Sequence, residues 1–413
     1  MTDILPILNK AIFPPQLNDE ESTFLAKAEQ IFNDELIPLA KENDELGRYP
    51  TKSIAILRKT GVFHAAVPKE LGGLGYSHAF SLECQLRLAM VDGAVAQLFK
   101  VHDELTREIF QYCPDAQKKR LANYLLEQNH VLGLAVAEAG KSAIDPMKTS
   151  VSRNTQGDYV INGFKIYTTA AAEADHIATW AFNADLVTED NPLSGMQLFL
   201  VPKDSPGVTV NRDWNALGQR ATDSGSIAFE NVVCKEDQIA SVSGKAPLIH
   251  SSVRYQAGFS AILVGLGFGA IKAALPYIKT KSRPWAATGI HDTSEDPYIK
   301  HTLGRITAAL NAAYVLVQRC GPLLDSFERG EIDRSSLALP ISSTKVAANE
   351  AALDATQTIF SMMGAGAVRK EFNFDYWWRN ARTLSLHDPV DWKIHEIGRH
   401  VLTGWEPEPG VYQ

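Results

Sequence analysis

The hydrophobic pattern of this chain changes its period twice, from helical to strand-like and back. From about residue 19 to 130, apolar side chains recur at the spacing of one helix face. Near residue 131 they begin to alternate as in half-buried strands, over roughly 110 residues. The helical spacing returns near residue 246 and holds to the end. This predicts an α+β fold with an N-terminal helical domain (1–130), a middle antiparallel β-barrel domain (131–245) and a C-terminal four-helix bundle (246–413).

Two details of this pattern carry their own predictions. Asn162-Gly163 is a turn signal inside the strand-like run Tyr159–Thr168. No charged residue occurs between Arg254 and Lys272, but this run is shorter than the roughly 20 apolar residues of a membrane span and is rich in glycine. We therefore expect a helix buried inside the bundle and no membrane partner. Gly265-Leu-Gly-Phe-Gly269 is not a dinucleotide loop, because it lies within this helical run and no strand precedes it.

Composition excludes several classes of function. The formal net charge of −8 argues against nucleic acid as a partner. The four cysteines are far apart and show no C-x-x-C spacing, so neither a metal site nor a disulfide framework is indicated. The first residues lack the basic region and apolar core of a signal peptide, which favours a cytoplasmic protein.

The segment Arg379-Asn-Ala-Arg-Thr-Leu-Ser-Leu-His387-Asp388-Pro389 places an imidazole beside a carboxylate at the end of a helical stretch. Histidine is the side chain most easily tuned for proton transfer near neutral pH. A His-Asp pair at such a place is also compatible with a helix cap or a surface contact. The pair alone does not decide between these interpretations.

Five motifs in order connect this pair to a family. They are Ala137-Glu138-Ala139-Gly140-Lys141-Ser142, Gly163-Phe-Lys-Ile-Tyr167-Thr168-Thr169, Leu217-Gly-Gln-Arg-Ala-Thr-Asp-Ser224, Phe229-Glu-Asn-Val232, and Gly364-Ala-Gly366 ahead of Arg379-Asn-Ala-Arg382. Together they resemble the acyl-CoA dehydrogenase superfamily over essentially the whole chain. The resemblance implies a flavin held between the strand domain and the helical bundle, usually in a homotetramer.

The His-Asp pair also points to a branch of that superfamily. Aligned on Arg379-Asn-Ala-Arg382, the Tyr-Glu-Gly-Thr of many family dehydrogenases, whose Glu removes the substrate α-proton, is replaced by His387-Asp388-Pro389-Val390. This ending and Ser282-Arg-Pro-Trp285 resemble the flavin-dependent monooxygenases of sulfur acquisition and desulfurisation. That resemblance implies oxygen, reduced FMN from a separate flavin reductase, and a flavin hydroperoxide that oxygenates a small organosulfur compound.

The same resemblance implies roles for particular residues. His387, oriented by Asp388, is the first candidate for proton transfer and His102 the second, although a histidine like His102 also occurs in plain dehydrogenases of the superfamily. Thr169 stands where relatives carry a small hydroxyl near the flavin, or is a strand-end threonine bonded to backbone. The implied cofactor contacts are Glu138, Ala139, Tyr167, Thr168, Thr169, Trp214, Arg283, Gly364, Gly366 and Arg369. Tyr167 and Trp214 could equally be core residues, and Arg283 is expected to bind the flavin phosphate, reaching a neighbouring subunit.

Three positions depart from the desulfurisation pattern. Leu134, Ala137 and Gly366 stand where relatives often carry Asn, Ser and Arg, and Arg369 is the candidate replacement for the last. Two other functions therefore remain open. One is an acyl-CoA dehydrogenase with FAD and Asp388 as its base. The other is a protein without catalysis that has lost its flavin ligands and acts by binding.

Overall fold

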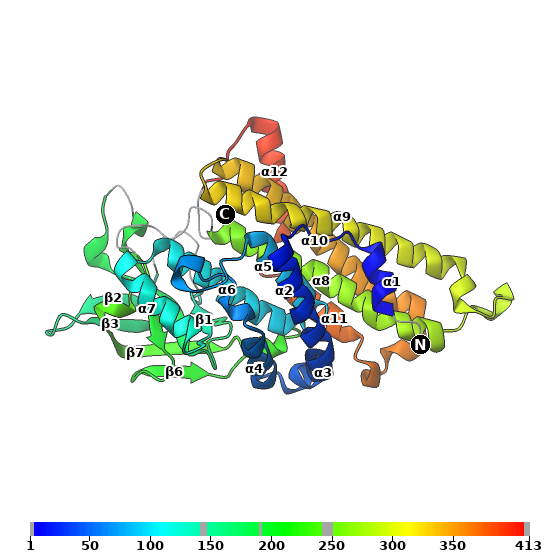
Figure 1. Ribbon diagram of the computed structural model, residues 1–413, viewed down its shortest axis with the longest axis horizontal. Coiled ribbons are helices and arrows are strands. Elements are labelled where there is room, and N and C mark those ends of the chain that lie inside the picture. The colour runs from blue at the N-terminus through cyan, green and yellow to red at the C-terminus, as the bar shows by residue number, and fades with distance from the viewer. Residues whose placement is uncertain (1–3, 141–146, 190–191, 242–250, 409–413) are drawn as a thin grey trace.

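The computed structural model describes residues 4–140, 147–189, 192–241 and 251–408. Lys141 and Ser142 of the first motif lie outside these ranges. Short helices and a sheet occupy one end of the long axis, and long helices extend to the other end (Figure 1). The predicted α+β class and its helix–strand–helix order are confirmed.

The N-terminal region is helical. Its helices are α1 (Ile4–Ala11), α2 (Asp19–Ile31), α3 (Ile37–Leu46), α4 (Thr51–Thr60), α5 (His78–Ala89), α6 (Gly93–Tyr112) and α7 (Asp115–Leu126), with a π-helical turn, Phe32–Leu36, between α2 and α3. A capping box between Asn18 and Glu21 begins α2. Helices α5 and α6 are buried along nearly their whole length, because both pack against the long helix α8.

The middle region forms one seven-stranded sheet in the order β1-β4-β2-β3-β7-β6, with β5 beside β4. The strands are β1 (Leu132–Ala135), β2 (Ser150–Arg153), β3 (Tyr159–Lys165), β4 (His176–Phe182), β5 (Met196–Pro202), β6 (Val208–Asn211) and β7 (Ser226–Cys234). The sheet is mainly antiparallel, but β1 pairs with β4 in parallel and β2 meets β4 in parallel at one position. The predicted antiparallel pairing holds for most of the sheet, and the parallel pairs of β4 are an addition to it. The long connection from β1 to β4, which includes β2 and β3, provides the crossover that parallel pairing requires.

Asn162-Gly163 is not a turn, and this prediction is wrong. Strand β3 continues through both residues with a shift of register between Ile161 and Gly163. A Cβ at Gly163 would lie 2.3 Å from the Thr149 hydroxyl, so only glycine allows this approach. The Asn162 side chain accepts a hydrogen bond from the backbone N–H of Asn231 on β7, which ties the irregularity to the neighbouring strand.

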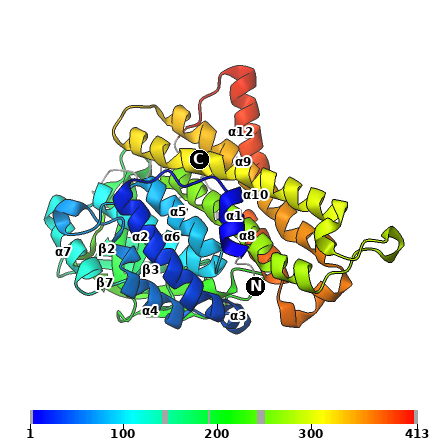
Figure 2. The ribbon, with the colours of Figure 1, turned by 45° about the vertical axis from the view of Figure 1, so that its right-hand side comes forward.

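The C-terminal region holds the longest helices. These are α8 (Ser251–Thr280), α9 (Pro297–Glu328) and α10 (Arg334–Met363), and the shorter helices α11 (Asp375–Ser385) and α12 (Val390–Thr403) follow. Helix α12 packs against α10 and points away from the body in both views (Figures 1 and 2). The segment Ser252–Thr280 is long and apolar enough to cross a membrane, but 83% of its most apolar window is buried inside the protein. It is the predicted core helix. A Cβ at Gly265 would lie 2.3 Å from the Leu86 carbonyl oxygen, so this glycine lets α5 approach α8 closely.

Candidate active site

His387 lies in the short connection between α11 and α12. Its Nδ1 is 3.2 Å from Oδ2 of Asp388, and the same oxygen accepts a hydrogen bond from the Gln256 amide on α8. The His387 side chain is 49% exposed, whereas that of Asp388 is 8% exposed. An ionised carboxylate only accepts hydrogen bonds, so Nδ1 of His387 is the donor and the Nε2 lone pair stays available. Asp388 thus fixes both the orientation and the tautomer of the exposed ring.

The charge state of this pair follows from its surroundings. Removal of water around the ring lowers the pKa of His387, the Asp388 carboxylate opposes this, and Lys100 and Lys345 add to the lowering. Burial alone would raise the pKa of Asp388, but hydrogen bonds from His387 and Gln256 hold it at about 2. At neutral pH the pair is therefore a neutral imidazole on an ionised carboxylate, ready to accept a proton at Nε2.

Phe259 of α8 is the centre of a group of polar side chains below His387. The His387 ring packs against Phe259 at a tilt of 40°, with 4.0 Å between the ring centroids. The ammonium groups of Lys100 on α6 and Lys345 on α10 lie 3.8 and 4.9 Å from the same centroid. Lys100 also binds the Glu104 carboxylate at 2.8 Å. Four elements thus meet at one aromatic ring.

A second group of side chains, in the loops that follow β3 and β6, offers aromatic rings and hydroxyl groups. Tyr167 has a left-handed backbone, with φ of 55°, and its side chain is 65% exposed. Its ring meets Trp214 edge to face at 6.1 Å. Thr169 is half-buried, and its hydroxyl is 3.0 Å from that of Ser224. Thr168 is buried and donates to the Gly225 carbonyl, so its hydroxyl is already used. Tyr167, Trp214 and Thr169 are available to a flat ring system.

Helix α11 connects this group to His387. The indole of Trp214 donates to the Gln219 carbonyl oxygen, and the Gln219 N–H donates to the Asn380 side chain on α11. A Cβ at Gly218 would lie 2.1 Å from the Arg379 carbonyl oxygen. The loop that carries Trp214 therefore rests directly on the helix that leads to His387.

Glu138 of the first motif makes contacts inside the sheet domain. Glu138 forms a buried ion pair with Lys165 at 2.7 Å and accepts hydrogen bonds from the N–H groups of Lys148 and Thr149. These contacts overcome the effect of burial and hold the pKa of Glu138 at about 2. The carboxylate is thus fully engaged inside the sheet domain. Ala139 next to it is exposed, and its carbonyl oxygen accepts from Lys148.

His102 has an environment unlike that of His387. It is 1% exposed, its Nε2 is 2.9 Å from the Phe63 carbonyl oxygen, and its Nδ1 accepts from the Leu132 N–H at 3.1 Å. Burial lowers its pKa to about 4. Both ring nitrogens are occupied and the ring is neutral, so this geometry favours a histidine that joins α6 to β1.

The remaining predicted cofactor residues lie at the far end of the bundle. Arg283 is exposed in the connection between α8 and α9, and Arg369 is exposed beside Glu371 after α10. Gly364 caps α10, and a Cβ at Gly366 would lie 2.6 Å from the Tyr277 hydroxyl, so a larger residue there requires the Tyr277 side chain to shift. Figures 1 and 2 show both connections at the end remote from the sheet. One chain does not bring these residues to Tyr167 and Trp214.

Comparison with known proteins agrees with this geometry. Family models for the N-terminal, middle and C-terminal domains of acyl-CoA dehydrogenase match residues 18–128, 133–232 and 257–392. The chain belongs to the acyl-CoA dehydrogenase family. The branch is confirmed as well, since a dibenzothiophene monooxygenase of Mycolicibacterium goodii is 33% identical over 89% of this chain and 91% of its own length.

Two further relatives come from the same branch of the acyl-CoA dehydrogenase family. A probable FMNH2-dependent monooxygenase, SfnC of Pseudomonas putida, is 28% identical over 90% of this chain and 93% of its own. The crystal structure of FMN-bound TdsC from Paenibacillus sp. A11-2 matches with a TM-score of 0.88 and 28% identity, over 95% of this chain and 100% of that one.

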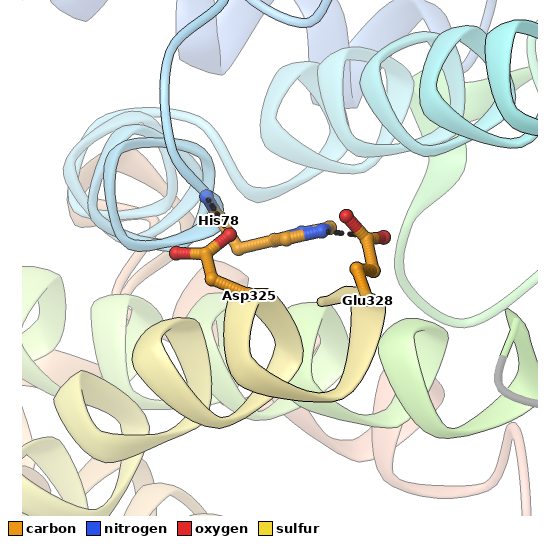
Figure 3. A group of neighbouring side chains, drawn as sticks. All are labelled: His78, Asp325 and Glu328. Carbon is orange, nitrogen blue, oxygen red and sulfur yellow. Dashed lines mark hydrogen bonds and ion pairs between the residues drawn. The ribbon is translucent and has the colours of Figure 1, made fainter. Parts of the chain in front are cut away.

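Outside this site, a group of titratable side chains in the described part of the chain has the spacing of metal ligands. His78 of α5 lies 2.9 Å from Glu328 of α9, and its backbone N–H donates to Asp325 (Figure 3). The guanidinium of Arg254 lies 3.9 Å from the same glutamate. A positive group beside the carboxylate opposes a bound cation, so we interpret this group as an ion-pair link between α5 and α9.

Sequence reasoning missed Gln256, Phe259, Lys100 and Lys345. Lys100 and Glu104 are four residues apart on a helix, a spacing that usually indicates a solvated surface pair. Lys345 gives no signal of its own, because the residues around it come from other helices.

Proposed function

We propose that this chain oxygenates a small organosulfur compound with molecular oxygen and reduced FMN, which a separate flavin reductase supplies. The class, a flavin-dependent organosulfur monooxygenase, is that of its relatives in the family. One oxygen atom is added to the substrate and the other leaves as water. The observation that carries the proposal is the half-exposed His387, held by Asp388 where family dehydrogenases place a catalytic glutamate.

The residues that face outward fit a flavin ring. Exposed Tyr167 and half-buried Trp214 offer aromatic edges and faces, and the half-buried Thr169 hydroxyl offers a hydrogen bond to a ring heteroatom. When bound, reduced FMN supplies the electrons that activate oxygen. The chain contributes binding and orientation on this side of the site.

Proton transfer is the part of the reaction assigned to His387. Its Nε2 accepts or returns the proton that the oxygen chemistry requires, while Asp388 keeps Nδ1 protonated. Phe259 covers the other side of the ring and keeps water from that face. His102, with both nitrogens occupied, has a positioning role at the base of β1.

A second copy of the chain completes the cofactor site in this proposal, within a homotetramer. Arg283 and Arg369 are exposed in connections at the end of the bundle remote from the sheet, and in this proposal they bind the phosphate of the FMN that a neighbouring copy holds. Large apolar side chains exposed on α9 and α12, such as Tyr298, Val401 and Leu402, support extensive contacts between copies. We place the reaction in the cytoplasm and in sulfur metabolism.

The test combines flavin binding with turnover. The purified protein is titrated with FMN and FAD, then assayed with a flavin reductase, NADH, oxygen and a panel of small sulfides, sulfones and sulfinates. The proposal predicts preferential binding of FMN and an oxygen-dependent product. Anaerobic reduction of bound FAD by an acyl-CoA would instead establish a dehydrogenase, and failure to bind either flavin would establish a non-catalytic protein.

A further inference from the structure

Gln256 is a buried polar side chain in the apolar helix α8, where it is 4% exposed. Its amide N–H donates to Oδ2 of Asp388, and its amide oxygen has no hydrogen-bond partner in the described part of the chain. Ser260, one turn further along α8, differs, because its hydroxyl donates to the backbone oxygen of Gln256 within the helix. Burial of an amide with one group unsatisfied costs stability. A glutamine that stands at this cost inside an apolar run is expected to serve the site that it contacts.

The Asp388 carboxylate connects Gln256 to His387. Its Oδ2 accepts hydrogen bonds from both side chains, one from α8 and the other from the connection before α12. A carboxylate that is stabilised by a donated hydrogen bond attracts a further proton less strongly. The attraction of Asp388 for the proton on His387 is therefore weaker with Gln256 in place than without it, and the pKa of His387 is raised less.

We propose that Gln256 is a positioning residue for proton transfer, which shares the Asp388 carboxylate with His387 and so keeps the imidazole neutral, fixed and ready to accept a proton at Nε2. The inference rests on the proposed function, in which His387 transfers the proton. Gln256 acts only through Asp388. Without the amide, the carboxylate binds the charged form of His387 more tightly, and one of its two anchors is lost.

The charged groups around this arrangement form contacts that do not involve Gln256. On the elements packed against His387 and Gln256, the titratable groups are Lys100 and Glu104 of α6, Lys345 of α10, and Lys393 and Glu396 of α12. Lys100 binds Glu104 at 2.8 Å, and Lys393 binds Glu396 at 3.0 Å. Lys100 and Lys345 both lower the pKa of His387. Since these contacts stay in place when the amide is removed, the effect of a substitution at Gln256 reaches His387 through Asp388.

The test is the titration of His387 in the purified protein without substrate. Diethyl pyrocarbonate reacts with neutral imidazole, and mass spectrometry of the peptide that holds His387 gives its rate from about pH 5 to 8, with the exposed His395 as reference. Gln256→Met keeps the length of the side chain but loses the donor, so we expect the pKa of His387 to rise by about 0.5 to 1 pH unit. Gln197→Met is the control and should cause no change, because Gln197 is a buried glutamine of β5 that accepts a hydrogen bond from Asn183.

A double-mutant cycle tests whether Gln256 acts through Asp388. Asp388→Asn should lower the pKa of His387, because the neighbouring negative charge is lost. In that background, Gln256→Met should change the pKa of His387 by less than about 0.2 pH unit. Where turnover is found, the acid limb of the pH profile of kcat should move with the pKa of His387 in each variant.

Two outcomes would overturn the inference: an unchanged pKa of His387 in Gln256→Met, or an equal rise with and without Asp388. If Gln256→Met does not fold, Gln256→Asn decides in the same way, because its side chain is one methylene shorter and does not reach Asp388. If no sulfur compound is oxygenated, the proposed function fails, whereas the titration of His387 still shows whether Gln256 controls its charge.

Discussion

The two ends of the helical bundle differ in how their candidate functional side chains are held. At the end near the sheet, His387 receives its orientation from Asp388 and Gln256, and all three come from one chain. At the far end, Arg283 and Arg369 are exposed, and Figure 1 shows the connections that carry them remote from the sheet. We propose that one chain organises proton transfer, whereas binding of the cofactor phosphate uses residues of a second copy. Substitutions near the sheet should therefore lower kcat, whereas substitutions at the far end should lower the affinity for FMN.

The largest expected effect is at the end near the sheet. His387→Asn keeps a polar side chain but removes the group that transfers protons, so we expect kcat to fall by about 10²- to 10⁴-fold. Binding of FMN should stay within twofold of wild type. The measurement is the rate of oxygenation with a flavin reductase in excess, with the exposed His395→Asn on α12 as control. A rate within threefold of wild type would show that His387 does not transfer the proton.

The next prediction compares His387 with His102, whose buried ring should affect stability and not proton transfer. Its pKa is about 4 when folded and about 6.5 when unfolded, so the unfolded chain binds more protons between these values. Stability is therefore complete above pH 6.5 and falls by about 3 kcal/mol as the pH drops to 4.

Urea unfolding at a series of pH values measures this dependence. His102→Gln should flatten the slope between pH 4 and 6.5 while its folded form retains turnover at pH 7. His176, whose pKa is also lowered to about 4, titrates in both proteins and so cancels in the difference. An unchanged slope would show that folding does not lower the pKa of His102, and loss of turnover in a fully folded variant would assign His102 to the catalytic site.

At the far end the effect should be on affinity. Arg283→Ala removes a charge-assisted contact of about 1.5–3 kcal/mol, so we expect FMN to bind more than about tenfold more weakly. At saturating FMN, kcat should return to near the wild-type value. Arg329→Ala is the control, because Arg329 is an exposed arginine paired with Glu331. Equal FMN affinity in wild type and Arg283→Ala would show that Arg283 does not bind the cofactor.

The smallest effect is expected at Thr169. Thr169→Val removes the hydroxyl next to Ser224 at constant shape, so we expect FMN affinity to fall by about threefold to tenfold, the value of one neutral hydrogen bond. Thr358→Val on α10, which removes a hydrogen bond to Asp354, should leave FMN affinity unchanged. Fluorescence quenching of FMN measures both. If both variants lost FMN affinity to the same extent, the loss would come from lower protein stability and not from the missing Thr169 hydroxyl.

The fold could be predicted because each region keeps one hydrophobic period over many residues. The core position of α8 could be predicted as well, because the chain has no charge between Arg254 and Lys272. The parallel pairing of β1 with β4 could not, since strand order depends on contacts between segments that are distant in the sequence. Asn162-Gly163 has the residues of a turn, but packing of Thr149 on Gly163 keeps the strand continuous.

The candidate site could be predicted only where its parts are adjacent in the chain. His387 and Asp388 are neighbours, so their pairing is visible in the sequence. The two partners of His102 lie 39 and 30 residues away, and whether its nitrogens are occupied cannot be read from the sequence. Lys345 is equally hidden, because its neighbours come from α6, α8 and the connection before α12.

We infer that one site combines His387 of one copy with Arg283 of another, and subunit mixing tests this most directly. His387→Asn and Arg283→Ala chains are co-expressed with different tags, and mixed oligomers are purified through both. FMN is kept below the dissociation constant of the Arg283→Ala protein, so that each variant alone is inactive. We predict that mixed oligomers recover a substantial fraction of wild-type oxygenation, since some of their sites contain neither substitution. Mixed oligomers as inactive as the two parents would contradict the account.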